Sequence, residues 1–329
     1  ITDDVQQGRI GALILDESSM LKSHYGKWGT RLIELGRGLE WKLAGTGTPA
    51  PNDRIEYANH AVLLDQFPNV NSFLARFFVN RGQTNERWEL KAHALRPFYR
   101  ALSHWCIFLT DPSVYGWKDN CGTLPPINVH IEDVGLTDDQ RGQAQRASGD
   151  LFGTLGGIGS RAKIARIAKG IGAESLKPDY VVNRVRSFGD ESRIVWCKYN
   201  PEQDELARRM PEAGNISGAT PHEERVDIVE RFQRGELKTI ISKPKILGLG
   251  LNMQIATRQL FSTLQDSYEE YYQAVKRSNR YGSTLPLNVH IPVTDLERPM
   301  IETVIRKAKR VQADAAEQEQ LFRESCNAG

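Results

Sequence analysis

The 329-residue sequence predicts an α/β fold with parallel sheets, and two observations lead to it. Short apolar segments alternate with helical segments through the second half of the chain, which is the pattern of a βαβ series. Near the start, "LILDESS" (13–19) places an acidic pair after an apolar segment, and open α/β sheets carry their chemistry at the carboxyl ends of strands. The chain is too long for one comfortable core, so we expect two domains.

The first part of the chain contains two candidate strands and then a helical region. Residues 10–16 are mostly apolar and residues 40–47 are bounded by small residues, and both are predicted to form short buried strands. Residues 53–110 have a helical pattern rich in aromatic side chains, which favours interhelix core packing over an aromatic platform for nucleic acid. Residues 122–137 contain a proline pair and then alternate, as expected of a connector entering an edge strand.

The second part contains five further candidate strands. They lie at residues 193–199, near 216, and at 238–242, 258–265 and 287–293. Helix starts with proline or capping residues follow three of them, which predicts a parallel sheet with helices on both faces. The chain then ends in a predicted helix from residue 298, whose apolar stripe consists of Ile301, Val304, Ile305, Ala308 and Val311.

The composition is that of a soluble globular protein, with 26% charged and 40% hydrophobic residues. No apolar run approaches the roughly 18 residues that cross a bilayer, and no secretory signal is visible, so we expect a soluble intracellular protein. A net charge of +2 restricts any nucleic-acid surface to a local region. The cysteines form no C-x-x-C pair and predict free thiols instead of a disulfide framework or zinc site: Cys106, Cys121, Cys197 and Cys326.

Two pairs of charged residues are candidates for chemistry, and each has a simpler interpretation. Asp16 and Glu17 either hold a metal ion and activate water, or form a solvated strand end. Arg277 and Arg280 stand three residues apart, hence on one predicted helical face. They form either a solvated basic face or a guanidinium pair that stabilises a transferring phosphoryl group. The scattered histidines are interpreted as structural or exposed, for example His24, His60 and His222.

Four short motifs occur in an order that resembles a known family. They are "LDESS" (15–19), "GTGTP" (45–49), "LGLGLN" (247–252) and "QAVKRSNRYG" (273–282). In this order they resemble motifs II, III, V and VI of the superfamily 2 helicase-like ATPases of the Swi/Snf type, in particular phage or prokaryotic members. The resemblance extends over roughly residues 10 to 310.

The resemblance implies two RecA-like lobes, each built on a parallel sheet, with ATP bound between them and Mg²⁺ as its metal. Residues 1–140 would form the later part of lobe 1 with a helical protrusion, and residues 141–175 a helical connector. Residues 176–297 would form lobe 2, and residues 298–329 a C-terminal bracing helix. The first lobe would be incomplete.

The resemblance also implies a role for each matching residue. Asp16 would hold magnesium through water, and Glu17 would position or deprotonate the attacking water. Arg277 and Arg280 would reach the γ-phosphate from the second lobe. Ser283 departs from the family, in which glutamine is usual at this position. The remaining matches would contact nucleotide (Gln273, Gly248, Gly250 and Asn252) or couple hydrolysis to lobe movement (Thr46 and Thr48).

One family element, the phosphate-binding loop G-x-G-K-[ST], is expected upstream of the acidic pair. Only fifteen residues precede Asp16 and they contain no such loop, and the glycine-rich residues 148–160 are not followed by G-K-[ST]. We therefore expect a fragment, or one half of a split enzyme, whose missing part of lobe 1 comes from an upstream segment or a partner chain. We expect the isolated chain to be inactive in ATP hydrolysis.

The family further implies a partner, duplex DNA, contacted mainly through its phosphates, and a translocating or remodelling activity. Four basic residues form the candidate contact, with a solvated helix face as the simpler interpretation: Arg161, Lys163, Arg166 and Lys169. The expected location is the cytoplasm of a prokaryotic or phage-infected cell. Two rival functions stay open, a non-catalytic lobe pair that binds nucleic acid or a partner, and a different α/β enzyme such as a nucleotide-dependent transferase.

Overall fold

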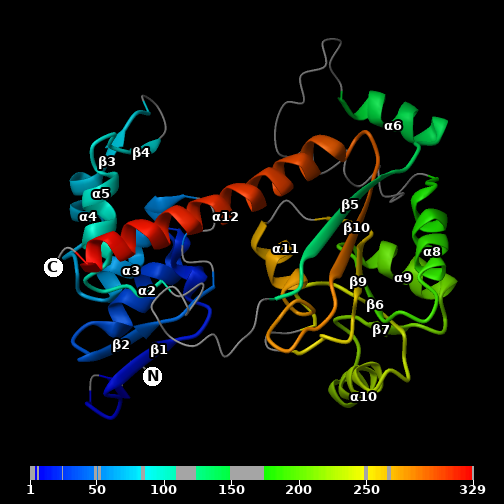
Figure 1. Ribbon diagram of the computed structural model, residues 1–329, viewed down its shortest axis with the longest axis horizontal. Coiled ribbons are helices and arrows are strands. Elements are labelled where there is room, and N and C mark those ends of the chain that lie inside the picture. Colours follow the sequence, from blue (N-terminus) through cyan, green and yellow to red (C-terminus); the bar gives the residue numbers. More distant parts are fainter. Residues whose placement is uncertain are drawn as a thin grey trace. The chain divides into compact units, whose positions relative to one another are not determined.

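The chain folds into two compact units (Figure 1). The computed structural model describes residues 4–5, 7–23, 25–47, 50, 53–82, 86–108, 124–148, 174–247, 251–264 and 268–327. The first unit consists of Ile1–Lys118 together with Lys309–Gly329, and the second of Asp119–Ala308.

The first unit contains a parallel pair of strands, β1 (Ala12–Leu15) and β2 (Trp41–Ala44). Helix α2 (Lys27–Gly36) lies between them in the chain. Both strands are present as predicted, but the prediction that they are buried is wrong, because alternate residues of each strand are exposed. The face with Leu13 lies against the helical layer, because Gly36 of α2 lies close to the side chains of Leu13 and Leu63. On the opposite face, Ile14 of β1 and Leu43 of β2 are paired in register and are 70% and 60% exposed.

A helical subdomain forms most of the remaining first unit. It comprises α3 (Tyr57–Leu63), α4 (Val70–Phe77), α5 (Leu95–Leu102), an antiparallel hairpin of β3 (Phe78–Asn80) with β4 (Trp88–Leu90), and the 3₁₀ helices η1 (Ser18–Lys22) and η2 (Arg54–Glu56). Phe98 lies at the centre of its core, with edge-on contacts to Phe73 and Phe77 at centroid distances of 6.0 and 5.4 Å. The aromatic residues of this region therefore form the hydrophobic core, as interpreted from the sequence.

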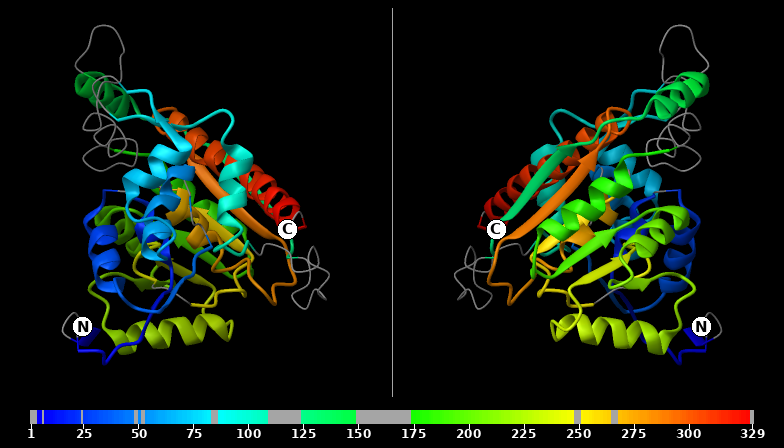
Figure 2. Two further views of the ribbon diagram at one scale, coloured as in Figure 1. Left: turned by 90° about the vertical axis from the view of Figure 1, so that its left-hand side faces the viewer. Right: turned by 90° about the vertical axis from the view of Figure 1, so that its right-hand side faces the viewer.

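The second unit is built on a six-stranded parallel sheet in the order β5-β10-β9-β6-β8-β7. Figure 2 shows the strands and helices of the chain from two further sides. Its strands are β5 (Ile127–Asp133), β6 (Arg193–Trp196), β7 (Gly214–Ile216), β8 (Thr239–Ser242), β9 (Arg258–Phe261) and β10 (Leu287–Val293). This sheet confirms the predicted α/β fold with parallel strands.

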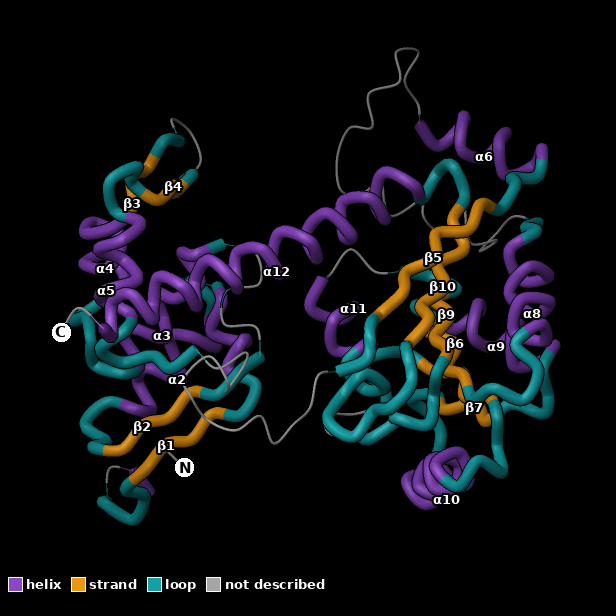
Figure 3. Tube along the Cα trace, viewed as in Figure 1, coloured by secondary structure: helices purple, strands orange, loops and turns teal. Residues whose placement is uncertain are grey.

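Helices cover both faces of this sheet (Figure 3). Helices α8 (Lys177–Ser187) and α9 (Asn200–Arg209) pack on the face that carries Val195 and Leu260. Helix α11 (Tyr268–Val275) lies on the opposite face, where Tyr271 contacts Phe261 at 5.3 Å between ring centroids. The other helices are α6 (Asp138–Ser148), α10 (His222–Gln233) beside β7, and α12 (Arg298–Asn327).

The boundary between the units differs from the expected one at residue 140. Strand β5 pairs with β10 over its whole length, from Ile127 opposite Leu287 to Asp133 opposite Val293. It therefore forms the edge of the second sheet and belongs to the second unit. The predicted C-terminal helix is present as α12, and its residues from Lys309 onward belong to the first unit. Most of the expected connector, residues 149–173, lies outside the described residues.

Candidate functional site

The acidic pair lies in the turn directly after β1. Asp16 is exposed, and its Oδ1 accepts a hydrogen bond from the backbone N–H of Glu17 at 3.0 Å. Glu17 has φ 54° and ψ 52°, a left-handed conformation that is uncommon for a residue with a side chain. Such backbone conformations concentrate at functional sites. An exposed carboxylate with room for water ligands suits Mg²⁺, which keeps several waters and binds one or two carboxylates plus phosphate.

Two buried residues, Ser18 and His60, stabilise the turn that contains the acidic pair. The Ser18 backbone N–H donates to the carbonyl of Gly45 at 2.9 Å, which ties the turn after β1 to the turn after β2. The Ser18 hydroxyl lies 3.1 Å from His60 Nε2, and His60 Nδ1 lies 3.3 Å from the carbonyl of Glu56. A carbonyl only accepts, so Nδ1–H donates to it and Nε2 accepts from Ser18. Burial lowers the pKa of His60, which keeps the ring neutral.

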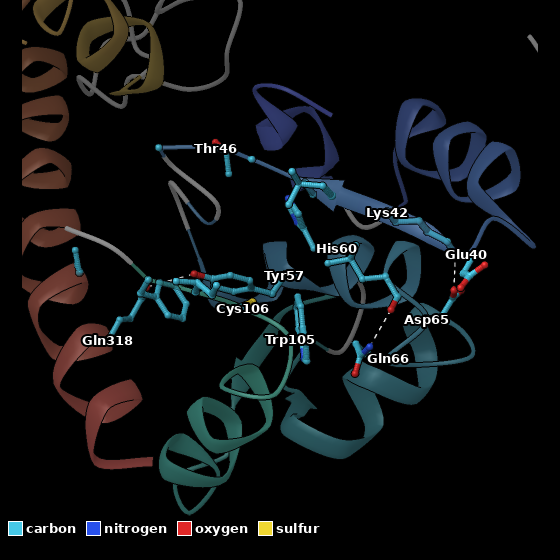
Figure 4. A pocket seen from close by; sticks show the side chains of 18 residues that line it. Glu40, Lys42, Thr46, Tyr57, His60, Asp65, Gln66, Trp105, Cys106 and Gln318 are labelled. Atoms are coloured by element: carbon cyan, nitrogen blue, oxygen red, sulfur yellow. Dashed lines mark hydrogen bonds and ion pairs between the residues drawn. The ribbon is translucent and has the colours of Figure 1, made fainter. Parts of the chain in front are cut away.

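Thr46 follows β2 and lines a cavity of about 640 Å³ (Figure 4). The walls include His60 and Cys106, and burial raises the pKa of the Cys106 thiol to about 12. The ion pair of Lys42 with Asp65 lies at one end of the cavity (Figure 4). Asp16 and Glu17 are not among the lining residues, so this cavity runs along β2 and is separate from the acidic pair.

The two candidate arginines of the second unit do not lie on a helical face. Helix α11 ends at Val275, and Arg277 and Arg280 follow in turns. Arg277 is 6% exposed, and its Nη2 donates to the carbonyl of Pro244 at 3.4 Å. Arg280 is exposed, and its Nη1 donates to the carbonyl of Leu251 at 3.3 Å. The spacing argument was therefore wrong about the helix, and only Arg280 presents its guanidinium to solvent.

The segment from Leu251 to Gln254 is hydrogen-bonded to the segment that carries the two arginines. The Met253 N–H donates to the carbonyl of Arg277 at 3.0 Å, and Gln254 Nε2 donates to the carbonyl of Tyr281. Asn252 donates from Nδ2 to Gln254 Oε1 at 3.1 Å, so it braces this link. Gln273 lies half-buried in α11, one turn before Arg277.

Several predicted site residues lie outside the described residues, so their predicted roles stay predictions. They are Thr48, Gly248 and Gly250, and the basic residues Arg161, Lys163, Arg166 and Lys169. Among the residues that the structure describes, no three or more His, Cys, Asp or Glu side chains gather into a metal-binding group. In the same part of the chain, no helix is both long and apolar enough to cross a bilayer.

Sequence comparison finds one family match, and it lies within the second unit. Residues 177–282 match the helicase conserved C-terminal domain. The matched segment begins at the start of α8 and ends two residues after Arg280, so the match includes both arginines and the segment bound to them. None of the curated proteins matches the sequence significantly.

The chain is also similar to three solved structures. It resembles the C-terminal part of the Fun30 ATPase domain with 12% identity and a TM-score of 0.47, over 55% of this chain and 89% of that chain. It resembles the Sulfolobus solfataricus SWI2/SNF2 ATPase C-terminal domain with 16% identity and a TM-score of 0.40, over 55% and 86%. With the SWI2/SNF2 ATPase core of the same organism in complex with dsDNA, it shares 17% identity over 94% and 70%, with a TM-score of 0.44.

Proposed function

We propose that this chain belongs to a nucleic-acid-dependent ATPase of the Swi/Snf type that translocates on or remodels duplex DNA. The observation that carries the proposal is the helicase domain match over residues 177–282, because it contains the bound arginine segment. A second observation supports it, since the first unit presents an acidic pair in a left-handed turn at the carboxyl end of a parallel strand.

In this proposal, the acidic pair and the arginines act on one nucleotide. Asp16 holds Mg²⁺ through water, and the metal supplies charge neutralisation at the phosphates. Glu17 orients the attacking water and accepts its proton. Arg280 contacts the γ-phosphate directly because its side chain is exposed, whereas the buried Arg277 mainly fixes the loop and adds positive charge. Gln273, Gly248, Gly250 and Asn252 contact the nucleotide, and Thr46 and Thr48 couple its hydrolysis to movement.

The proposal assigns the phosphate loop to another polypeptide segment, encoded upstream or carried by a partner chain. The sequence contains no G-x-G-K-[ST]. The β1–β2 pair gives independent support, because parallel sheets are normally covered on both faces and Trp41 is 67% exposed on the same face as Ile14 and Leu43. A strand and helix carrying the phosphate loop would cover this apolar face.

The alternative is a non-catalytic lobe pair that binds nucleic acid or a partner protein. The observation that favours it is the same missing loop motif, since nucleotide phosphates would then lack their backbone cradle. Binding of duplex DNA does not distinguish the two functions, because both would involve contacts to DNA phosphates. ATP hydrolysis does distinguish them.

The test is phosphate release by the chain joined to the polypeptide encoded immediately upstream, with and without duplex DNA. We expect DNA-stimulated release that is abolished by Glu17→Gln, a variant that keeps the size of the side chain and removes its charge. If the joined protein binds DNA but releases no phosphate above the Glu17→Gln background, the non-catalytic alternative is correct.

The DNA partner has its own test, because the basic residues of 161–169 are expected to contact phosphates. Replacing Arg161, Lys163, Arg166 and Lys169 with alanine should weaken binding to all duplex sequences equally. Each lost contact should lower the slope of log affinity against log salt concentration by about 0.9. If fluorescence anisotropy shows unchanged DNA affinity and an unchanged salt slope, the simpler interpretation of these residues as a solvated face is correct.

A further inference from the structure

A glutamine is buried in the middle of the second sheet, on the face covered by α11. Gln259 of β9 is 0% exposed, and its neighbours on this face are apolar: Ile194, Trp196 and Phe261. Central strands of parallel sheets are usually continuous apolar runs. A buried amide costs free energy unless its hydrogen bonds are satisfied, so its partners indicate what it does.

The partners of Gln259 connect three elements. Its Oε1 accepts from Trp196 Nε1 of β6 at 3.0 Å. Its Nε2 donates to the backbone carbonyl of Ala274 at 3.0 Å and to the hydroxyl of Ser278 at 2.8 Å. Ala274 lies in the last turn of α11, and its carbonyl also accepts from the Arg277 N–H at 3.3 Å, in the first turn beyond the helix. Gln259 therefore caps the C-terminus of α11 from the sheet and binds the first turn beyond it.

The hydrogen bonds continue from Ser278 to Arg280. The Ser283 hydroxyl donates to the carbonyl of Ser278 at 2.8 Å and accepts from the Arg280 N–H at 3.2 Å. The Ser283 N–H donates to the carbonyl of Arg280 at 2.9 Å. Ser283, which stands where the family usually has glutamine, thus closes the turn that carries Arg280. On its other side, the segment is fixed by the bond from Met253 N–H to the carbonyl of Arg277.

We propose that Gln259 is a positioning residue for Arg277 and Arg280. Its hydrogen bonds end α11 after Val275 and fix the position of Ser278. The positions of the two arginines that follow the helix are thereby set, together with the turn 278–283 that contains Arg280. The inference rests on the proposed function for what the arginines contact, but the positioning itself is a property of the second unit. Satisfied buried polar networks impose one arrangement where apolar packing would allow several.

A matched pair of variants separates positioning from general stability. Gln259→Met keeps the length of the side chain and removes the two hydrogen bonds that Gln259 Nε2 donates to Ala274 and Ser278. Trp196→Phe removes the donor to Gln259 Oε1 and some buried volume, but leaves both bonds from Gln259 Nε2 in place. Both variants lower the stability of the second unit, and only the first releases the arginine segment.

The first readout is amide hydrogen exchange of the full chain. In Gln259→Met, exchange at the amides of Met253, Arg280 and Ser283 should rise about tenfold relative to Trp196→Phe, as expected when ordinary hydrogen bonds are lost. Exchange at Val195 and Ile241, in the central strands, should differ little between the variants. Equal exchange at Met253, Arg280 and Ser283 in both variants would overturn the proposal, whatever the chain does with ATP.

The second readout is hydrolysis by the chain joined to its upstream polypeptide. Gln259→Met should lower kcat on the order of tenfold to a hundredfold with little change in KM, because misplaced catalytic groups act mainly on the transition state. Trp196→Phe should change neither parameter. Faster exchange with an unchanged kcat would show that Gln259 has only a structural role. If the wild-type joined protein does not hydrolyse ATP, the proposed function is wrong. Hydrogen exchange alone then tests whether Gln259 positions the arginine segment.

Discussion

The two parallel sheets of this chain differ in how completely they are covered. In the second unit, helices cover both faces of the central strands, and Ile241 and Leu260 are fully buried there. The edge strand β5 is largely exposed, with Val129 at 41% and Ile131 at 42%. In the described part of the first unit, two parallel strands are covered on one face, and Ile14, Trp41 and Leu43 stand exposed on the other. The centre of the second sheet is therefore closed, whereas both strands of the first sheet share an apolar surface that another segment would bury.

The candidate chemistry is divided in the same way. The second unit holds its arginine segment with a chain of hydrogen bonds that runs from Gln259 through Ser278 to Ser283. The first unit holds its acidic turn through Ser18 and His60, but leaves Asp16 exposed. The acids and the arginines are therefore each preorganised within their own unit, and the phosphate cradle is the element that we assign to another segment.

The largest expected effect concerns Arg280, the exposed one of the two candidate arginines. In the joined protein, Arg280→Ala should reduce turnover on the order of 10³-fold while ATP still binds, because arginines of this kind act on transition-state charge. Steady-state phosphate release and nucleotide binding would measure the two effects. Turnover within about twofold of wild type would show that the assignment of this motif is wrong.

The next largest effect is on stability and concerns a buried ion pair between Lys177 and Glu297 in the second unit. Lys177 Nζ, at the start of α8, lies 2.8 Å from both carboxylate oxygens of Glu297, and both side chains are almost fully buried. Lys177→Met leaves the Glu297 charge without its partner, which should cost about 3–5 kcal/mol of unfolding free energy. Arg234→Ala, in an exposed pair with Glu236, is the control and should leave the denaturant midpoint unchanged. Equal midpoints for both variants would contradict this account.

One matched substitution compares the two sheets directly. Leu260→Ala in β9 should destabilise the second unit by about 2–5 kcal/mol, because it opens a cavity in a closed core. Leu43→Ala in β2 should change the stability of the chain alone by less than about 0.5 kcal/mol, because the side chain is 60% exposed. In the joined protein, Leu43→Ala should become more costly. A cost that stays the same after joining would show that the added segment does not cover this face.

The smallest expected effect is a pH dependence that both units share. Burial lowers the pKa of His60 in the first unit and is the largest cause that lowers the pKa of His290 in the second. The folded state therefore binds protons less readily than the unfolded chain, so stability is complete above the ordinary histidine pKa of about 6.5 and falls as the pH drops below it.

Single glutamine substitutions would assign this pH dependence to each unit. His60→Gln should reduce the loss of unfolding free energy of the first unit as the pH falls. His290→Gln should reduce the same loss in the second unit. His290 is surrounded by Glu132, Arg184, Arg258 and His130, so the substitution is best judged between pH 7 and 5, above the range where carboxylates titrate. Thermal unfolding that declines equally in wild type and both variants would exclude these two residues as the cause.

The fold was predictable to the extent that it depends on local pattern. The apolar segments at 193–199, 238–242 and 287–293 became β6, β8 and β10. Strand β5 was predicted as an edge strand but assigned to the wrong unit, because its partner β10 lies about 160 residues further along the chain. No local pattern reports a pairing of that separation.

The candidate site was predictable in its residues but not in its geometry. The acidic pair was found because it follows an apolar strand. Its support from His60 could not be predicted, because the contact between Ser18 and His60 joins residues far apart in the sequence. Arg277 and Arg280 were placed on a helix because their spacing fits one. Helix α11 ends earlier because Gln259, from another element, binds its last turn, and no glycine or proline marks this end before Gly282.

The most direct test of the central claim is phosphate release by the 329-residue chain alone, with and without duplex DNA, compared with its Glu17→Gln variant. The account predicts that the chain is folded and releases phosphate no faster than the variant under either condition, since the acids and arginines are present but the phosphate cradle is not. Robust DNA-stimulated release by the chain alone, abolished in Glu17→Gln, would contradict it and show that residues within this chain hold the phosphates.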